Sequence, residues 1–121
     1  MIYCHIIDDY KLQGILANLK QKEWWQKNAP NKLYKEDYKI ALLEHSFCWS
    51  ISIILPLIII TILTRNDKLL NVVLYSTPIN MSIHYIIDNL KANEHIINLQ
   101  TDQLIHIIQV IITWLFAIFT F

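Results

Sequence analysis

The sequence is poor in glycine, in charge and in cysteine. Its single glycine, Gly14, excludes glycine-rich phosphate-binding loops and the GxxxG helix-packing motif. Charged residues make up only 17% of the chain, against about 25% in a typical soluble domain. Ten basic residues balance ten acidic ones, so no basic surface is available for a nucleic-acid partner. Two cysteines, Cys4 and Cys48, do not make a disulfide framework.

Hydrophobic residues, by contrast, make up 55% of the 121 residues, and the mean hydropathy is +0.35. Three stretches without formally charged side chains each approach the roughly 20 residues needed to cross the hydrocarbon of a bilayer. The last stretch is apolar on every side, which is typical of a helix buried in lipid or in a large core. A chain this short has no large core. We therefore predict an all-α, polytopic helical membrane protein with transmembrane helices at 39–64, 69–91 and 101–121, in a single domain over 1–121.

The first 38 residues are more polar than the rest of the chain. The segment 2–19 looks helical, but acidic and basic side chains interrupt it. A lysine-rich segment follows and carries Trp24 and Trp25, a combination that suits the headgroup layer of a membrane. We expect an N-terminal helix that is interfacial or re-entrant, followed by a Trp/Lys-rich loop, with the lipid bilayer as partner.

The distribution of basic residues predicts the orientation in the membrane. Seven of the ten lie between Lys11 and Lys39, and Lys91 begins the loop on the same side. Only Arg65 and Lys68 lie on the opposite side. The positive-inside rule then places the N-terminal region and the 91–100 loop in the cytoplasm.

Histidine and aspartate recur in pairs at i, i+4 spacing, which places both side chains on one face of a helix. The pairs are His5 with Asp9, His84 with Asp88, and Asp102 with His106, and His45 is a fourth histidine in the first predicted span. The histidines of the three spans each lie five to seven residues from the cytoplasmic end, or roughly 8–10 Å deep. Ionisable residues inside membrane spans are costly and mark functional sites by default. We predict that these side chains converge near the cytoplasmic face.

Imidazole and carboxylate together suit a divalent metal such as zinc, manganese or iron. We expect His45, His84 and His106 as metal ligands, with Asp88, Asp102 and the pair His5 and Asp9 as further ligands or as the general base. The site has enough donors for two metals, or for one metal with carboxylates that orient the histidines. Lys91 would neutralise an anionic substrate, and the expected reaction is hydrolysis. A hydrogen-bonded core without metal is the simpler alternative.

Four motifs follow one another along the chain: His5-Ile-Ile-Asp-Asp9-Tyr-Lys-Leu-Gln13, then His45, then His84-Tyr-Ile-Ile-Asp88-Asn-Leu-Lys91, then Asp102-Gln103-Leu-Ile-His106. The order of these motifs resembles that in a known family, the small bacterial and phage integral-membrane proteins of domain of unknown function 3307. The likeness covers about residues 5–110. It implies the characteristic positions His5, Asp9, Gln13, His45, His84, Asp88, Lys91, Asp102, Gln103 and His106, and a bacterial inner-membrane location. Many members carry extra apolar residues before the first histidine, and their absence here favours the re-entrant helix.

The sequence leaves three functions open. The first is a metal-dependent membrane hydrolase that acts on a phosphate ester or an amide close to the lipid. The second is a transporter of protons or divalent ions, which three spans form only as a homo-oligomer. The third is a non-enzymatic phage or prophage protein that binds a host membrane partner.

Overall fold

The computed structural model describes residues 1–121, and every regular element in it is helical, which confirms the predicted all-α fold. Three long helices correspond to the three predicted ranges, and each begins two residues earlier than predicted. They are α4 (Asp37–Thr64), α5 (Asp67–Ala92) and α6 (Leu99–Thr120). The elements before them are α1 (Ile2–Ile7), the π-helical turn η1 (Asp8–Leu12), α2 (Leu16–Leu19), α3 (Lys22–Asn28) and the 3-10 turn η2 (Lys32–Tyr34).

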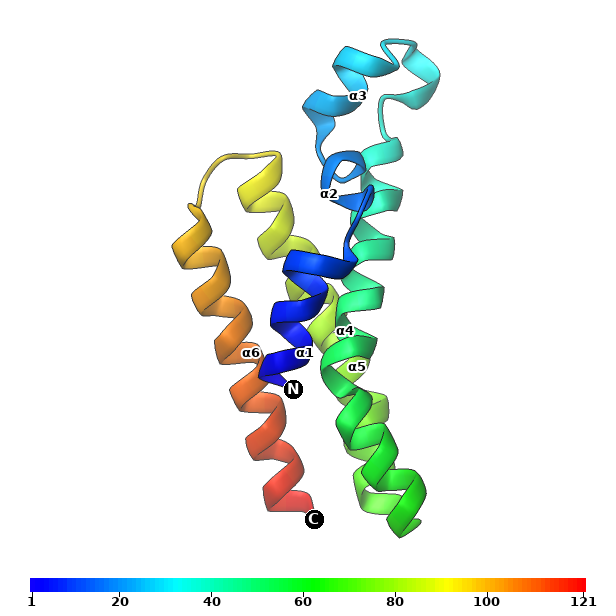
Figure 1. Cartoon of the computed structure of the whole chain (residues 1–121), viewed down its shortest axis with the longest axis vertical. Coiled ribbons are helices and arrows are strands. Elements are labelled where there is room, and N and C mark those ends of the chain that lie inside the picture. The colour runs from blue at the N-terminus through cyan, green and yellow to red at the C-terminus, as the bar shows by residue number, and fades with distance from the viewer.

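The helices α4 and α5 form an antiparallel hairpin, as the polar turn between the first two predicted spans indicates. α4 ends where Arg65 adopts a left-handed conformation with φ of 50°. The side chain of Asn66 then accepts hydrogen bonds from the backbone N–H groups of Lys68 and Leu69 and caps α5. α6 packs against α5, while α1 lies between α4 and α6 and contacts both (Figure 1).

The N-terminal segment is broken into short pieces rather than forming one helix over 2–19. The chain begins halfway along the bundle and runs toward the end at which α3 and the α5–α6 loop lie (Figure 1). It turns after η1 at Gly14, whose φ of +49° is a conformation that favours glycine. α1 lies beside α4 and α6, while its interfacial or re-entrant position in a membrane stays a prediction.

Two helical segments are long and apolar enough to cross a membrane, namely Lys32–Thr64 and Leu99–Thr120. The third predicted span is present as a helix, α5, but it does not reach the same hydropathy. The polar residues of α5 explain the difference. Ser76, Asn80 and His84 lie four residues apart along its buried face and lower the mean hydropathy of the helix. The three-span prediction is therefore supported for two helices and stays a prediction for α5.

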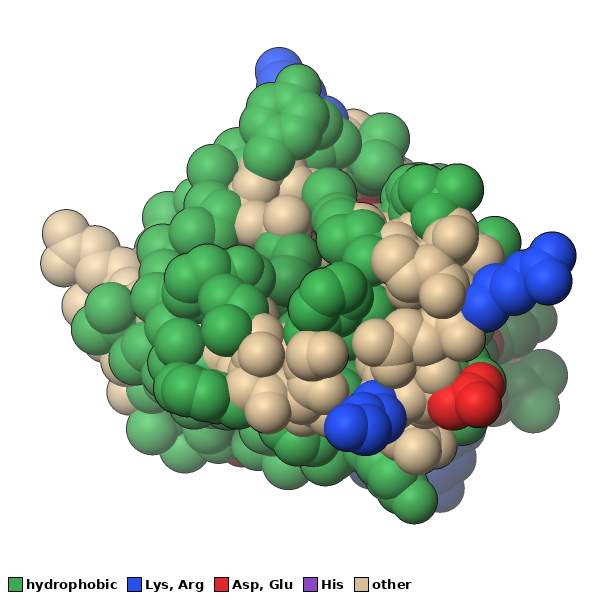
Figure 2. Space-filling model, turned by 90° about the horizontal axis from the view of Figure 1, so that it is seen from below, with side chains coloured by type: hydrophobic (Ala, Val, Ile, Leu, Met, Phe, Trp, Pro, Cys, Tyr) green, Lys and Arg blue, Asp and Glu red, His purple; other side chains and the backbone are tan.

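The interior of this molecule is more polar, and its surface more apolar, than in a typical soluble protein. Of the 27 buried residues, 16 are polar or charged, whereas such residues are mostly exposed in soluble proteins. Large apolar side chains such as Ile79, Ile83 and Ile112 are more than one-third exposed. The end of the molecule seen in Figure 2 is largely hydrophobic, with a few charged side chains at its edge.

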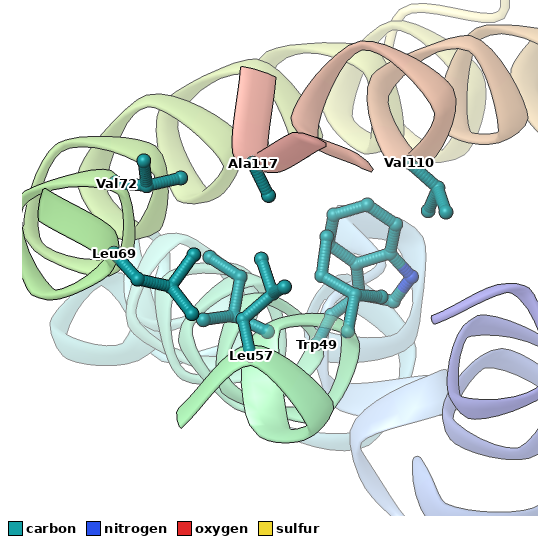
Figure 3. Close-up of a cluster of buried hydrophobic side chains, with 8 residues drawn as sticks. Trp49, Leu57, Leu69, Val72, Val110 and Ala117 are labelled. Atoms are coloured by element: carbon teal, nitrogen blue, oxygen red, sulfur yellow. The ribbon is translucent and has the colours of Figure 1, made fainter. Parts of the chain in front are cut away.

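A smaller hydrophobic cluster lies beside the polar interior and joins the three long helices (Figure 3). Trp49, Ile53, Ile54 and Leu57 of α4 pack there against apolar residues of α5 and α6. Trp49 also contacts the rings of His5, His84 and His106, so this hydrophobic cluster packs directly against the buried polar side chains.

Candidate metal centre

Four segments of the chain bring the predicted His and Asp residues into one buried cluster. α1 and η1 supply His5 and Asp9, α4 supplies His45, α5 supplies His84 and Asp88, and α6 supplies Asp102 and His106. Each of these seven residues is at most 7% exposed. The N-terminal segment therefore reaches the site, a point that the sequence left open.

The carboxylate of Asp88 lies near the middle of the cluster. Its Oδ2 atom is 3.3 Å from Nε2 of His45, and its Oδ1 atom is 3.3 Å from Nε2 of His106. Asp102 approaches the same nitrogen of His106 at 3.4 Å. Two carboxylates thus face one imidazole nitrogen.

Asp9 approaches the cluster from the π-helical turn. Its Oδ2 atom is 3.5 Å from Nδ1 of His5, and its Oδ1 atom is 3.6 Å from Nε2 of His45. Gln103 of α6 donates a hydrogen bond from Nε2 to Oδ2 of Asp9 at 3.1 Å. The widened turn of η1 leaves Asp9 facing the site while its neighbour Asp8 accepts a hydrogen bond from Ser52 of α4.

His84 lies between the other two histidines of the long helices. Its Nε2 atom is 3.2 Å from Nε2 of His45, and its Nδ1 atom is 3.2 Å from Nδ1 of His106. The indole of Trp49 stacks on the His84 ring with centroids 4.1 Å apart, and its N–H group donates to Nδ1 of His5 at 2.9 Å. Stacking and hydrogen bonding by Trp49 thus fix two imidazole planes.

Two sets of these side chains could hold a metal ion, namely Asp9, His45 and His84, and His84, Asp88 and His106. Within each set one donor atom from every residue lies within 4.8 Å of the others. Asp102 belongs to neither set but lies beside the second one, since its Oδ1 atom is 3.4 Å from Nε2 of His106 and is buried without a hydrogen-bond partner. An unpaired carboxylate oxygen is costly in a protein interior, and a cation next to it would remove that cost.

Two lysines compensate part of the negative charge. Nζ of Lys20 lies 2.6 Å from Oδ2 of Asp88, and Nζ of Lys91 lies 2.6 Å from Oδ2 of Asp102. Lys91 is also 3.6 Å from Oδ1 of Asp88. Three carboxylates, counting Asp9, therefore meet two ammonium groups, and one negative charge is left when the imidazoles are neutral.

Gln109 fixes the tautomer of His106. Its side-chain nitrogen donates to the backbone carbonyl of Asn80 at 3.2 Å, so its oxygen Oε1 faces Nδ1 of His106 at 2.9 Å. Because an amide oxygen only accepts, Nδ1 of His106 must carry a proton. In the neutral ring the lone pair is then on Nε2, the nitrogen that faces Asp88 and Asp102, as a metal ligand requires.

Replacing Gln109 with leucine should weaken metal binding. The substitution removes the acceptor of the His106 N–H, and loss of such an orienting hydrogen bond lowers metal affinity by about 10- to 100-fold. A Gln109→Glu variant keeps an acceptor oxygen at the same position and should retain more affinity than Gln109→Leu. Titration of metal-free protein with zinc in detergent measures the difference. Equal affinities in wild type and Gln109→Leu would contradict this role.

Outside the spans, burial shifts two pKa values in the N-terminal segment. Burial lowers the pKa of His5, although the neighbouring Asp9 opposes the shift. A neutral imidazole is the form that binds a metal, so the direction favours a ligand. Burial also raises the pKa of Asp8, partly offset by its hydrogen bond from Ser52.

Several residues that contact the site were not among those predicted from the sequence. Lys20 lies in a lysine-rich segment, and nothing in the sequence distinguishes it from the neighbouring lysines. Trp49 follows His45 by four residues and Asn80 precedes His84 by four, so both were detectable by the same helical spacing as the aspartates. Gln13, a position that only the resemblance singled out, donates from Nε2 to the backbone carbonyl of Asp9, and its Oε1 has no hydrogen-bond partner.

Comparison with known proteins assigns no family or function to the chain. No protein-family model, curated protein or solved structure matches the chain. None of these comparisons bears on the resemblance to domain of unknown function 3307, which stays a prediction.

Proposed function

We propose that this chain is an integral membrane protein whose buried His/Asp cluster binds a divalent metal ion and hydrolyses a phosphate ester or an amide close to the lipid. The observation that carries the proposal is the convergence of four histidines and three aspartates from four segments of the chain. Such a cluster is costly to bury, and hydrogen bonds within it leave Oδ1 of Asp102 unpaired.

The distribution of side chains on α5 supports a third span. Its 26 residues would extend about 39 Å as a helix. Its buried face carries Asn80, His84 and Asp88, while Ile79 and Ile83 are exposed on other faces. A helix with polar residues inside and apolar residues outside suits lipid rather than water. The lysine-rich segment around α3 and the α5–α6 loop lie toward the same end of the molecule (Figure 1), which is consistent with the cytoplasmic assignment of both.

The residues present fit a divalent cation such as zinc, manganese or iron. His45, His84 and His106 would bind it, with Asp88 as a carboxylate ligand and Asp9 from the N-terminal segment. The single negative charge left by the carboxylates and lysines is what a cation would compensate. A bound ion would act as a Lewis acid and lower the pKa of a water molecule.

The chain's own groups account for the other requirements of hydrolysis. Asp102 has a free lone pair on Oδ1 and can accept a proton as general base. Lys91 lies between Asp102 and Asp88, where its ammonium group can neutralise charge that develops on a substrate oxygen. Burial of Asp88 and Asp102 strengthens both interactions, because charges act over a lower dielectric in a protein interior than in water.

The test of hydrolysis uses full-length protein in detergent, loaded separately with zinc, manganese or iron. Mixed micelles that contain phospholipids and N-acylated lipids serve as substrate, and released phosphate, amine and fatty acid are measured. We expect turnover that chelation abolishes and that His84→Ala lacks. A metal-loaded, folded wild-type protein that releases none of these products would contradict the hydrolase.

A second function, proton transfer, is supported by one specific observation. A row of buried hydrogen-bonded side chains continues from His106 through Gln109 and Asn80 to Thr113. Over the seven residues from His106 to Thr113 this row extends about 10 Å along α6. If the row conducts protons, proteoliposomes should acidify under a membrane potential and Asn80→Leu should slow the flux. A hydrolase without a proton path leaves the internal pH of the vesicles unchanged.

A further inference from the structure

One groove of the molecule reaches the metal centre. It has a volume of about 380 Å³ and lies between the N-terminal segment and α4. Leu12 and Leu16 form one wall, and Phe47 and Ile51 form the other. Leu12 and Phe47 are at least half exposed, so the groove opens through an apolar rim, and His45 of the metal centre lines it.

Two of the side chains that line the groove carry buried polar atoms without hydrogen-bond partners. His45 is 1% exposed, and its Nδ1 atom has no hydrogen-bond partner. Histidines that bind a metal through one nitrogen almost always donate the N–H of the other to an acceptor. When Nε2 of His45 binds the metal, its Nδ1 carries a proton for which the protein supplies no acceptor. A ligand oxygen in the groove would fill this role.

Two other side chains that line the groove, Gln13 and Asp8, have oxygen atoms to which no group of the protein donates a hydrogen bond. Oε1 of Gln13 is buried and unpaired. The carboxylate of Asp8 accepts one hydrogen bond, from Ser52 to Oδ1 at 2.7 Å, which leaves Oδ2 available. No lysine or arginine lines the groove. A ligand with an N–H donor and a positive charge would satisfy Gln13 and Asp8, whereas an anion without an amine would meet the charge of Asp8 uncompensated.

We infer that this groove binds a zwitterionic phospholipid with a primary amine, of the phosphatidylethanolamine type. Its ammonium group meets Asp8 and Gln13, its phosphate or ester oxygen accepts the N–H of His45, and an acyl chain lies along the apolar walls. The inference rests on the proposed metal centre through His45 and names the lipid that the site selects. Because the three polar contacts come from η1, the residue after it and α4, the lipid would also hold the N-terminal segment against the bundle.

Phosphatidylcholine is a matched probe, because it differs only by three methyl groups that remove every N–H donor of the ammonium. Full-length protein is incorporated into nanodiscs with equal amounts of phosphatidylethanolamine, phosphatidylcholine and phosphatidylglycerol. Native mass spectrometry then counts the lipids that stay bound after release. We expect about tenfold enrichment of phosphatidylethanolamine over phosphatidylcholine, the difference that one charge-assisted hydrogen bond produces.

The variants separate this inference from the proposed function. Asp8→Asn should lose most of the enrichment, whereas Asp67→Asn, which removes an exposed carboxylate at the start of α5, should keep it. Metal content is measured on the same samples. Metal-loaded wild type that retains the two lipids equally would overturn the inference and leave the metal centre standing. Metal-free protein that enriches phosphatidylethanolamine would contradict the metal centre and support the amine selectivity.

Discussion

Wild-type protein purified in detergent should contain one equivalent of a divalent transition metal, and His84→Ala should contain less than about a tenth of that amount. His84 belongs to both candidate ligand sets, so its loss leaves neither intact. We expect His106→Ala to lose the metal as well, because His106 faces Asp88 and Asp102 through the nitrogen that Gln109 leaves free. Elemental analysis by mass spectrometry measures the content per chain.

His95→Ala is the matched control. Its side chain is 64% exposed, in the α5–α6 loop, and its ring lies near Glu23 rather than near the site. This variant should retain the wild-type metal content. A folded wild-type protein that is metal-free and fails to bind added zinc, manganese or iron would contradict the metal centre, and the cluster would then be a hydrogen-bonded core or a proton path.

The number of metals per chain follows from charge. Three carboxylates and two lysines leave one negative charge, which a single divalent ion converts to one positive charge. With neutral imidazoles, a second ion would add two more positive charges to a buried site in which Asp8 is the only other carboxylate nearby, a large desolvation cost. One equivalent is therefore expected, and two equivalents would require that both lysines leave the site.

The convergence of the histidines was predictable because helix geometry is regular. His45, His84 and His106 lie at similar distances from helix ends on the same side of the molecule, and a rise of 1.5 Å per residue converts such counts into depth. The i, i+4 spacing fixed which aspartate shares a face with each histidine. The structure brings these residues together, while their role as ligands stays a prediction.

The N-terminal segment was less predictable, because its path depends on tertiary contacts. Nothing in the local sequence shows that η1 widens so that Asp8 faces Ser52 of α4 while Asp9 faces Gln103 of α6. Lys20 reaches Asp88, 68 residues away, after a turn at Gly14, whose φ of +49° is a conformation that favours glycine. The mean hydropathy of α5 also depends on tertiary contacts, since its buried polar residues lower it, and its role as a third span stays a prediction.

The buried ion pair of Lys20 and Asp88 should make a large contribution to the free energy of unfolding. Lys20→Met should destabilise the metal-free protein by about 3–5 kcal/mol, because it takes the nearer of two lysines away from the buried carboxylate of Asp88 and leaves only Lys91, 3.6 Å from the other oxygen. Nζ of Lys20 lies 2.6 Å from Asp88, and the Lys20 side chain is only 8% exposed. Lys27→Met removes an exposed lysine from α3 and should change stability little. Thermal or denaturant unfolding in detergent micelles measures both variants.

Metal should reverse the effect of Lys20→Met, and this reversal separates a metal centre from a simple ion pair. A divalent ion next to Asp88 supplies the charge that the ammonium group supplied, so binding to the folded state offsets the lost interaction. The variant should also bind metal more tightly than wild type, because Lys20 no longer competes with the ion for Oδ2 of Asp88. If added metal leaves the unfolding midpoint of Lys20→Met unchanged while the protein is folded, Asp88 is not a ligand, and the two lysines satisfy its charge in the wild type.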